Sequence, residues 1–309
     1  MNRRLAPLLA VTLALLLVDS PYVLNLAGLM AVQALPAVGL ALLLGHAGQI
    51  SLCHAGFYGL GAYGSAILGR RYGLDPWLSS ALAIGTTGLL ARLLGQPVLR
   101  LRGHYLAMAT LGLGSIISIV LVEWRSVTGG SAGLRGIPGF TLLGLDLAEP
   151  ALFAPFAWGV LLLAVALAGN LIASPAGLLL RGLDDSERAV GSLGTDTARL
   201  KAQVFALSAM LAAAGGALYA HAIGFLSPQP FGVGFSVRLL VMVAIGGMRS
   251  LTGVVCGVAF TTIIAEPLQD FGAYDVVVFG VLLVGIIVLC PEGLLPALAH
   301  WARRRVSLA

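Results

Sequence analysis

Charged side chains gather in one short stretch of this sequence, RGLDDSERAVGSLGTDTARLK, which runs from Arg181 to Lys201. Eight of its 21 residues are Asp, Glu, Lys or Arg, whereas apolar residues dominate on both sides. The chain contains no HExxH and no GxxxxGK[ST] motif, so it offers neither a zinc-peptidase site nor a phosphate-binding loop. We therefore expect the stretch to contact a protein. We also expect the chain not to be an enzyme, and any ATP hydrolysis to take place on partner subunits.

The same stretch carries the signals of a short amphipathic helix. Asp184 can cap a helix, and Glu187 follows three residues later in the arrangement of a capping box. The remaining signals are the apolar positions Ala189, Val190 and Leu193, the stop at Gly194, and a cap for the next helix at Thr195 or Asp196. A solvated loop would account for the charge alone. A partner protein that covers the apolar face would account for the caps as well.

Cysteine and histidine spacing does not favour a metal or cofactor site. Cys53, Cys256 and Cys290 lie in or beside apolar runs without a CxxC pair, which is typical of helix packing. His46 and His54 can share a helix face, but no carboxylate accompanies them. We expect no disulfide, no bound metal and no cofactor.

The composition indicates that a lipid bilayer surrounds most of the chain. Hydrophobic residues make up 59% of the 309 residues and charged residues only 10%, against about 25% charged in an ordinary soluble domain. The net charge of +5 does not indicate nucleic-acid binding, because the basic residues form no stripe with interleaved aromatics. The sequence predicts an all-α polytopic membrane protein.

Apolar runs give the expected number of membrane crossings. They lie at about 5–18, 22–44, 53–69, 77–99, 104–122, 151–173, 202–226, 233–248, 250–266 and 274–295. A full span takes about 20 residues, so several of these helices are short or broken. We predict about ten crossings, with eight or nine if the short runs are half-helices. We expect the first run to be a retained helix because no small-x-small cleavage site follows it.

The distribution of basic residues sets the expected orientation. With both termini in the cytoplasm, twelve of the 18 basic residues lie inside and four outside, which follows the positive-inside rule. The inner set is Arg3, Arg4, Arg100, Arg102, Arg181, Arg188, Arg199, Lys201, Arg249, Arg303, Arg304 and Arg305. The chain is then a single transmembrane domain over 1–309, with a cytoplasmic loop at 174–201 and a glycine-rich outer loop at 123–150.

Polar residues interrupt the apolar pattern between the second and third runs. Gln49 and Ser51 lie in GHAGQISLCHAGFYGLGAYG, whose glycines favour close helix packing. Uncompensated polar groups are expensive inside a membrane. Gln49 and Ser51 therefore either cap a broken helix or line a translocation path.

Several motifs together resemble a known transporter family. The stretch ERAVGSLG (187–194) resembles the coupling loop of bacterial ABC-importer permeases. The order and spacing of further motifs resemble the LivM-type permeases of branched-chain amino-acid importers: GHAGQISLCHAGFYGLGAY (45–63), TGGSAGLRGIP (128–138), GALYAHAIGFLSPQPF (216–231), LLVMVAIGGMRSLTG (239–253) and PEGLL (291–295). The chain departs from the family pattern at Cys53, Gly191, Gln229, Pro230, Arg249 and Cys290.

The resemblance implies a type II importer permease in the bacterial plasma (inner) membrane. Its implied partners are a second, LivH-like permease, two cytoplasmic ABC ATPases, an extracytoplasmic substrate-binding protein and membrane lipid. The implied ATPase-coupling residues are Arg181, Asp184, Glu187, Arg188, Ala189, Val190, Leu193 and Gly194. The implied cargo is branched-chain amino acids, with urea, other amides or sugars as alternatives.

A transporter that works alone is the competing interpretation. Secondary transporters use broken helices near the middle of the membrane, and residues 45–53 are a candidate break. This interpretation leaves the capped helix near residue 187 without a role.

Overall fold

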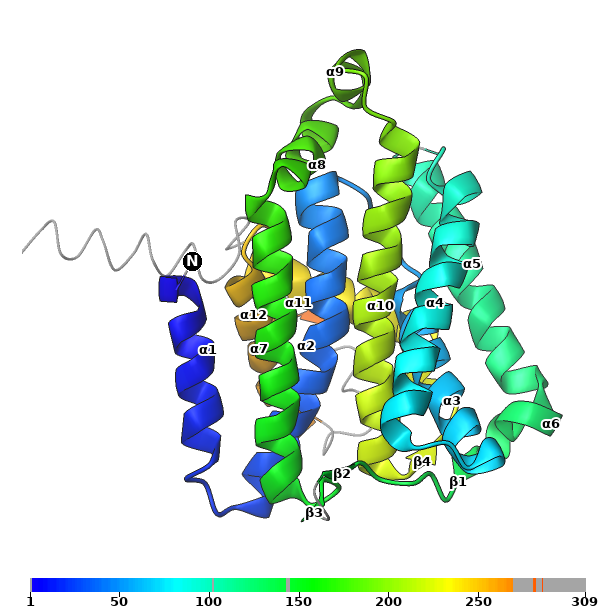
Figure 1. Cartoon of the computed structure of the whole chain (residues 1–309), viewed down its shortest axis with the longest axis vertical. Helices are drawn as coiled ribbons and strands as arrows, with labels where there is room; N and C mark the ends of the chain where they lie inside the picture. The colour runs from blue at the N-terminus through cyan, green and yellow to red at the C-terminus, as the bar shows by residue number, and fades with distance from the viewer. Residues whose placement is uncertain (1, 102, 143–144, 269–279, 282–284, 286–309) are drawn as a thin grey trace, which may run out of the picture.

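Helices make up most of this computed structural model, which describes residues 2–268 except 102 and 143–144, together with 280, 281 and 285 (Figure 1). Five of the described helices are long and apolar enough to cross a membrane: α2 (Pro21–Ala47), α4 (Pro76–Val98), α5 (His104–Glu123), α7 (Pro150–Ala173) and α10 (Thr197–Ile223). Helices α11 (Val233–Gly246) and α12 (Leu251–Leu268) add a sixth span if they count as one, bent by 119°. The chain is an all-α polytopic membrane protein.

The apolar runs predict helix positions better than they predict membrane crossings. Nine of the ten runs coincide with described helices, including α1 (Asn2–Leu15) and α3 (His54–Tyr72), and the tenth run lies almost wholly outside the described residues. Helix α1 is short, and α3 is too polar for a span by composition because it is rich in glycine and ends in Arg70 and Arg71. Among the described helices, composition thus supports five or six crossings, fewer than the predicted ten.

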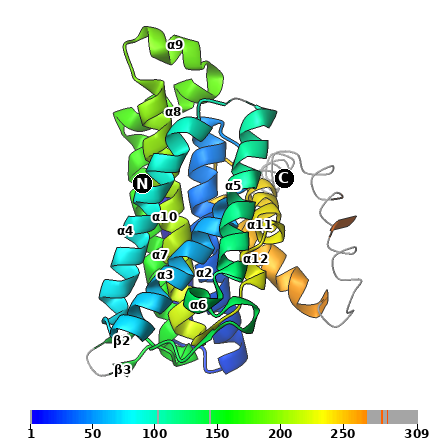
Figure 2. The same ribbon diagram turned by 90° about the vertical axis from the view of Figure 1, so that its right-hand side faces the viewer.

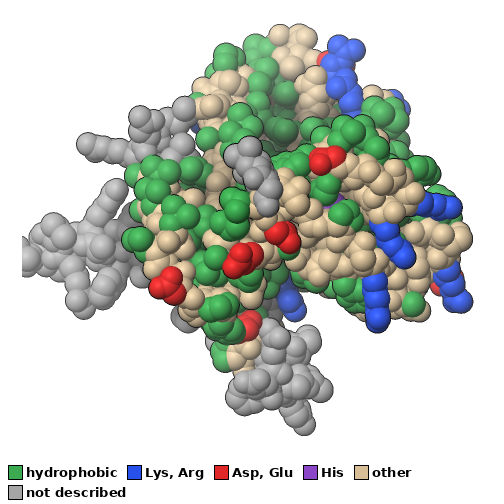
Figure 3. Space-filling view, turned by 60° about the horizontal axis from the view of Figure 1, so that its bottom comes forward, with side chains coloured by type: hydrophobic (Ala, Val, Ile, Leu, Met, Phe, Trp, Pro, Cys, Tyr) green, Lys and Arg blue, Asp and Glu red, His purple; other side chains and the backbone are tan. Residues whose placement is uncertain are grey.

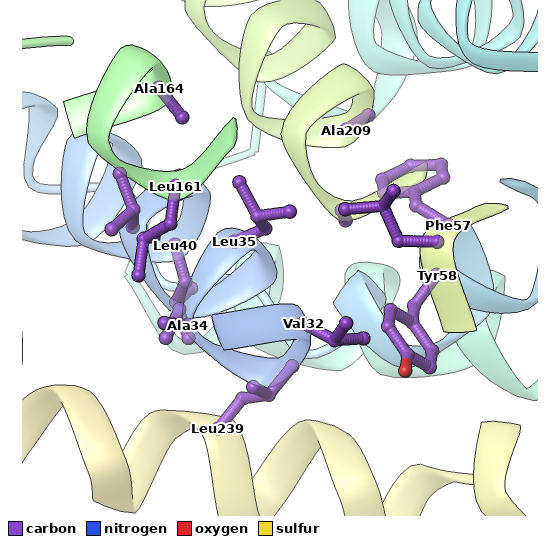
Figure 4. Close-up of a cluster of buried hydrophobic side chains, with 14 of the residues drawn as sticks. Val32, Ala34, Leu35, Leu40, Phe57, Tyr58, Leu161, Ala164, Ala209 and Leu239 are labelled. Atoms are coloured by element: carbon purple, nitrogen blue, oxygen red, sulfur yellow. The ribbon is translucent and has the colours of Figure 1, made fainter. Parts of the chain in front are cut away.

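Helix α2 lies at the centre of the bundle. It packs against α7, α10, α11 and α12, and most of its residues are buried. Figure 4 shows Leu35 and Leu40 of α2 among side chains from the surrounding helices, including Leu161 of α7 and Leu239 of α11. The indole of Trp158 on α7 also donates to the Ala27 carbonyl over 2.9 Å. These contacts hold α2 in position between the helices that carry the polar residues described below.

Helices α3 and α10 approach each other closely. A Cβ atom on Gly61 of α3 would overlap the backbone of Ala213, and one on Gly216 of α10 would overlap the Tyr58 carbonyl. Small residues at such a crossing let two backbones come into direct contact, which is a main source of helix association in membranes. The glycine-rich pattern predicted this packing.

Exposed apolar side chains cover the outside of the bundle. They include Leu89 and Leu93 of α4, Ile116 and Ile119 of α5, and Leu163 and Leu167 of α7. In water such a surface would aggregate, whereas a bilayer solvates it.

The two ends of the bundle differ in structure (Figures 1 and 2). Helices α8 (Pro175–Asp185) and α9 (Glu187–Ser192) extend beyond one end. The opposite end carries short elements: α6 (Arg125–Thr128), η1 (Gly130–Ala132), β1 (Leu134–Arg135), β2 (Thr141–Leu142), β3 (Leu145–Asp146), β4 (Phe225–Leu226) and η2 (Gln229–Phe231). Strand β1 pairs antiparallel with β4, and β2 with β3. The turn-rich stretch 123–150 therefore has local structure over its described residues.

Candidate functional site

Residues 184–194, where one short helix was expected, belong to two helices, the end of α8 and α9. Helix α8 continues through Asp184, because its Leu180 and Leu183 are buried against the bundle. The chain then turns at Ser186, whose extended backbone separates α8 from α9. The Ser186 hydroxyl accepts a hydrogen bond from the Ala189 amide over 3.4 Å and so caps α9. The prediction that Asp184 starts this helix was wrong by two residues.

One part of the apolar face of α9 is buried within the chain, and the other part is exposed to solvent. Val190 is buried against α8, where a Cβ on Gly182 would lie 2.8 Å from the Val190 Cγ2 atom. Leu193 is 76% exposed, and Arg188 and Ala189 are exposed beside it. Burial within the chain therefore removes Val190 from the face that we expected to meet a partner.

The end of this segment agrees with the sequence signals. Gly194 adopts a left-handed backbone with φ of 80°, as expected for a helix stop. Asp196 accepts from the Arg199 amide over 3.0 Å and caps α10, which settles the choice between Thr195 and Asp196.

An ion pair ties α9 back to α10. Glu187 Oε1 lies 2.7 Å from the ammonium nitrogen of Lys201, whose side chain is only 3% exposed. The same carboxylate oxygen accepts from the Thr197 hydroxyl over 3.2 Å. A buried ammonium needs a paired acceptor of this kind. The pairing orients Glu187 toward α10 and links α9 to that helix.

The two other predicted coupling residues lie on α8. Arg181 is exposed, and Asp184 Oδ2 accepts a hydrogen bond from Arg249 Nη2 over 2.8 Å. Arg249 lies in the turn between α11 and α12, 65 residues further along the chain. No local sequence signal predicts this pair.

The predicted break between the second and third apolar runs is present. Residues 48–53, here called the 48–53 break, separate the end of α2 from the start of α3. The first residue of α3, His54, lies beside Ser208, the twelfth of the 27 residues of α10. Helix α3 therefore begins beside the middle of α10, a helix long and apolar enough to cross a membrane.

Side chains from two other helices satisfy backbone amides around this helix start. Thr110 of α5 accepts from the Leu52 amide over 3.1 Å, and Ser236 of α11 accepts from the Ala55 amide over 3.0 Å. The first amides of a helix have no partner within the helix, and none is available from lipid. These hydroxyls therefore stabilise the helix start inside the membrane.

His54 joins the 48–53 break to α10. Its Nε2 lies 2.6 Å from Ser208 Oγ, and its Nδ1 lies 3.1 Å from Ser51 Oγ. Ser51 Oγ also lies 3.2 Å from Cys53 Sγ. All four residues are buried. The structure thus shows Ser51 bonded to side chains of a buried cluster, a role that sequence reasoning did not assign to it.

Gln49 differs from Ser51 in having a free acceptor. Its Nε2 donates to the Ala47 carbonyl over 3.1 Å, whereas its buried Oε1 has no hydrogen-bond partner. A buried acceptor without a partner is costly. Gln49 is therefore the residue of this region with unused capacity to bind a donor.

The histidines and cysteines are not gathered into a metal site in the part of the chain that the structure describes. No group of three or more His, Cys, Asp or Glu side chains with suitable geometry occurs there. Cys53 is buried in the cluster just described, Cys256 is exposed on α12, and Cys290 lies outside the described residues.

The end opposite α9 presents a mixed surface. Figure 3 shows most of its acidic side chains near the centre and left of the view and a group of basic ones on the right, with apolar side chains around them. Two polar contacts fix the loops at this end, one exposed and one partly buried. The Trp77 indole donates to the Thr141 carbonyl over 3.0 Å, and His221 Nδ1 lies 2.6 Å from the Pro138 carbonyl oxygen.

Comparison with known proteins identifies relatives over most of the chain. A family model described as branched-chain amino acid transport system / permease component matches residues 22–287. The chain is 35% identical over 282 residues to the high-affinity branched-chain amino acid transport system permease protein LivM of Salmonella typhimurium, covering 84% of this chain and 66% of that protein. It is 34% identical to the protein of the same name from Escherichia coli, covering 88% and 69%.

A more distant relative is named for the import of a different substrate. The autoinducer 2 import system permease protein LsrC of Klebsiella pneumoniae is 30% identical over 220 residues, which cover 68% of this chain and 59% of that protein. The chain spans about two thirds of the length of the curated relatives that it matches. No solved structure matches.

Proposed function

The chain belongs to the family of branched-chain amino acid transport permeases, and on this basis we propose that it is a membrane subunit of an ABC importer for branched-chain amino acids. ATP-driven closure of two cytoplasmic ATPases would switch the transport path between outward and inward access. A second, LivH-like permease would complete the path, and an extracytoplasmic binding protein would deliver the cargo. The chain itself would bind no nucleotide.

The observation that carries this proposal is the shape of the 181–194 segment. Helix α9 extends beyond the membrane-crossing helices and presents Arg188, Ala189 and Leu193 to solvent. The exposed leucine offers an apolar contact to a docked partner. The Glu187–Lys201 pair connects α9 to α10, so that force applied by a docked ATPase would reach the membrane. We assign docking to Arg188, Ala189 and Leu193, with Val190 as the internal support of α9.

The proposed orientation has α9 in the cytoplasm and the 123–150 loop outside. The asymmetry of basic residues supports it. With both termini cytoplasmic the number of crossings is even, and the ten apolar runs fit that condition. We propose ten crossings in a type II arrangement, in the bacterial plasma membrane.

The proposed transport path runs beside the 48–53 break. Gln49 Oε1 is a buried acceptor without a partner, and it suits the ammonium group of an amino acid. Ser51 belongs to the same break and would line the path only if the His54 cluster opens. The cargo named for the LivM relatives favours branched-chain amino acids. The LsrC relatives are named for import of autoinducer 2, so relatives of this chain carry more than one kind of cargo, and urea, other amides or sugars stay as the alternative.

A stand-alone secondary transporter is the second candidate, favoured by the polar break near the middle of the membrane. Such a protein would catalyse gradient-driven uptake in liposomes without ATPases. An ABC permease would not.

Substitution of Ala189 by Asp tests the coupling assignment. Ala189 is exposed on α9, and burying an unpaired carboxylate in a protein interface costs at least about 1–3 kcal/mol. We expect ATP-dependent uptake of leucine by the assembled complex to fall by about 5- to 150-fold, with normal membrane insertion.

Ala198→Asp is the matched control. Ala198 is also exposed, on the first turn of α10, where a carboxylate interacts favourably with the helix dipole. We expect this variant to transport normally. Normal transport by Ala189→Asp would show that α9 is only a solvated segment.

A further inference from the structure

Three segments that are distant in sequence meet at the base of α8. Asp184 lies in the last turn of α8, Gly48 follows the end of α2, and Arg249 lies in the turn between α11 and α12. We call these three residues the 48–184–249 joint. None of its members is adjacent to another in sequence, so only the fold brings them together.

The joint is closely packed. Asp184 Oδ2 accepts from Arg249 Nη2 over 2.8 Å. Gly48 has a φ of 62°, and a Cβ atom added there would lie 2.5 Å from Asp184 Oδ1 and 3.2 Å from Asp184 Cα. Position 48 therefore requires glycine for two reasons. Its backbone is left-handed, and Asp184 occupies the space that a Cβ atom would need.

A second contact connects the same segments without Asp184. A Cβ atom on Gly45 would overlap the Met248 carbonyl and would lie 3.3 Å from the Arg249 amide nitrogen. The end of α2 thus touches the turn between α11 and α12 directly. The Asp184–Arg249 pair then connects α8 to a unit that is already formed by α2 and this turn.

Each partner of the joint lies next to an interruption of a membrane helix. Gly48 is the first residue of the 48–53 break, which leads to the buried Ser51–His54–Ser208 cluster. Arg249 lies in the turn where α11 and α12 bend by 119°. Asp184 is two residues from Ser186, which caps α9. The joint is therefore the contact between the α8–α9 segment and both interruptions.

We propose that the Asp184–Arg249 pair positions the 48–53 break and the α11–α12 turn relative to α9, so that movement of α9 moves both. This role rests on the proposed transport function. It adds a second route into the membrane beside the one through Glu187, Lys201 and α10. The first route moves α10, whereas the joint moves the 48–53 break, which leads into α3, and the α11–α12 turn, which contacts the end of α2.

Exposure of the pair makes the role testable. The Arg249 side chain is 77% exposed and the Asp184 side chain 28% exposed, and ion pairs open to solvent contribute little to folding stability. Removing the pair is therefore expected to leave the protein folded. A weak contact that is made in only one of two conformations still changes the ratio of their populations. For an exposed ion pair we expect a change of about two- to fivefold.

The test uses the complete complex of permease subunits, ATPases and binding protein in proteoliposomes, with leucine as the probe. The variants are Arg249→Gln, Asp184→Asn, the double variant and Arg249→Lys. Arg100→Gln is the matched control, because Arg100 is also exposed and follows the end of α4. The measured quantity is the number of ATP molecules hydrolysed per leucine taken up, together with the thermal unfolding midpoint.

We expect each neutral single variant to raise this ratio about two- to fivefold at an unchanged unfolding midpoint. The double variant should be no worse than either single variant, because both remove one contact. Arg249→Lys and Arg100→Gln should keep the wild-type ratio. If Arg249→Gln lowers the unfolding midpoint, the test rests on Arg249→Lys, which keeps the positive charge. A changed ratio of ATP hydrolysed to leucine taken up in Arg249→Lys overturns the proposal.

Two further results separate this proposal from the function on which it rests. A wild-type complex that takes up no leucine with ATP refutes the proposed function itself. If the wild-type complex transports leucine, two results refute the joint alone. One is a neutral variant with the wild-type ratio of ATP hydrolysed to leucine taken up. The other is a double variant in which the effects of the two single substitutions multiply.

Discussion

Replacing Ser208 by Ala removes the hydrogen bond between α10 and the start of α3. Ser208 Oγ lies 2.6 Å from His54 Nε2, and both residues are fully buried. The substitution deletes one oxygen atom and leaves little empty space. His54 keeps its contact with Ser51 but loses its partner on α10. The change therefore isolates the contribution of one interhelical hydrogen bond.

The expected size follows from where the bond lies. Interhelical hydrogen bonds in membrane proteins contribute about 0.6 kcal/mol on average and up to about 1.7 kcal/mol. A buried polar group left without a partner costs about 1–3 kcal/mol. A short bond between two fully buried side chains belongs to the upper part of the first range. We expect Ser208→Ala to lower the free energy of unfolding by about 1–2 kcal/mol, a factor of roughly 5–30 in the ratio of folded to unfolded protein.

Unfolding in mixed detergent micelles with increasing dodecyl sulfate, followed by circular dichroism, measures this difference. Ser115→Ala is the matched control, because the Ser115 hydroxyl donates to the Leu111 carbonyl of its own helix α5. The control should change the free energy of unfolding by less than about 0.5 kcal/mol. A double variant with His54→Ala should lose less than the sum of the two single losses, because both remove the same bond.

Equal unfolding free energies for Ser208→Ala and Ser115→Ala would refute this reasoning. Strict additivity of Ser208→Ala and His54→Ala would do the same. In either case the His54–Ser208 contact would not hold the 48–53 break against α10, and the break would depend on Thr110 and Ser236 instead.

Two further predictions concern orientation and the end of α9. In whole cells, an impermeant thiol reagent should label Ser131→Cys in the 123–150 loop but not Arg100→Cys, and the opposite pattern would invert the proposed topology. Gly194→Val should strain the left-handed backbone at φ of 80° and cost about 1–2 kcal/mol. Gly194 is exposed and has open space around it, so a valine side chain fits there. We therefore expect Gly194→Val to reduce ATP-dependent uptake without preventing membrane insertion. Uptake at the wild-type rate by Gly194→Val would show that the turn after α9 has no part in coupling.

Helix positions followed from the sequence because lipid imposes a simple condition. Every backbone amide inside a membrane needs a partner, so an apolar run has to form a helix. Turn residues and prolines then set the ends, as at Pro76 and Pro150, which begin α4 and α7. The glycines of GHAGQISLCHAGFYGLGAYG likewise predicted close packing, and Gly61 lies at the crossing of α3 with α10.

The number of crossings did not follow as directly. Helix α3 is surrounded by α4, α5 and α10 and therefore has no need of an apolar sequence. Its Arg70 and Arg71 and its many glycines lower its hydropathy below that of a lipid-exposed span. A count of membrane crossings from apolar runs treats an interior helix such as α3 like a lipid-exposed one. The first is surrounded by other helices and the second by lipid.

The sequence by itself determined that this chain is an all-helical membrane protein, that residues 181–201 are its exceptional segment, and that a polar break follows the second helix. These features depend on local composition and spacing. Only the tertiary structure decided that Val190 is buried on Gly182, that Lys201 pairs with Glu187, that His54 meets Ser208 and that Asp184 meets Arg249. The last two contacts join residues 154 and 65 positions apart. Such contacts depend on how whole helices pack, and no local pattern records which face of one helix will meet another.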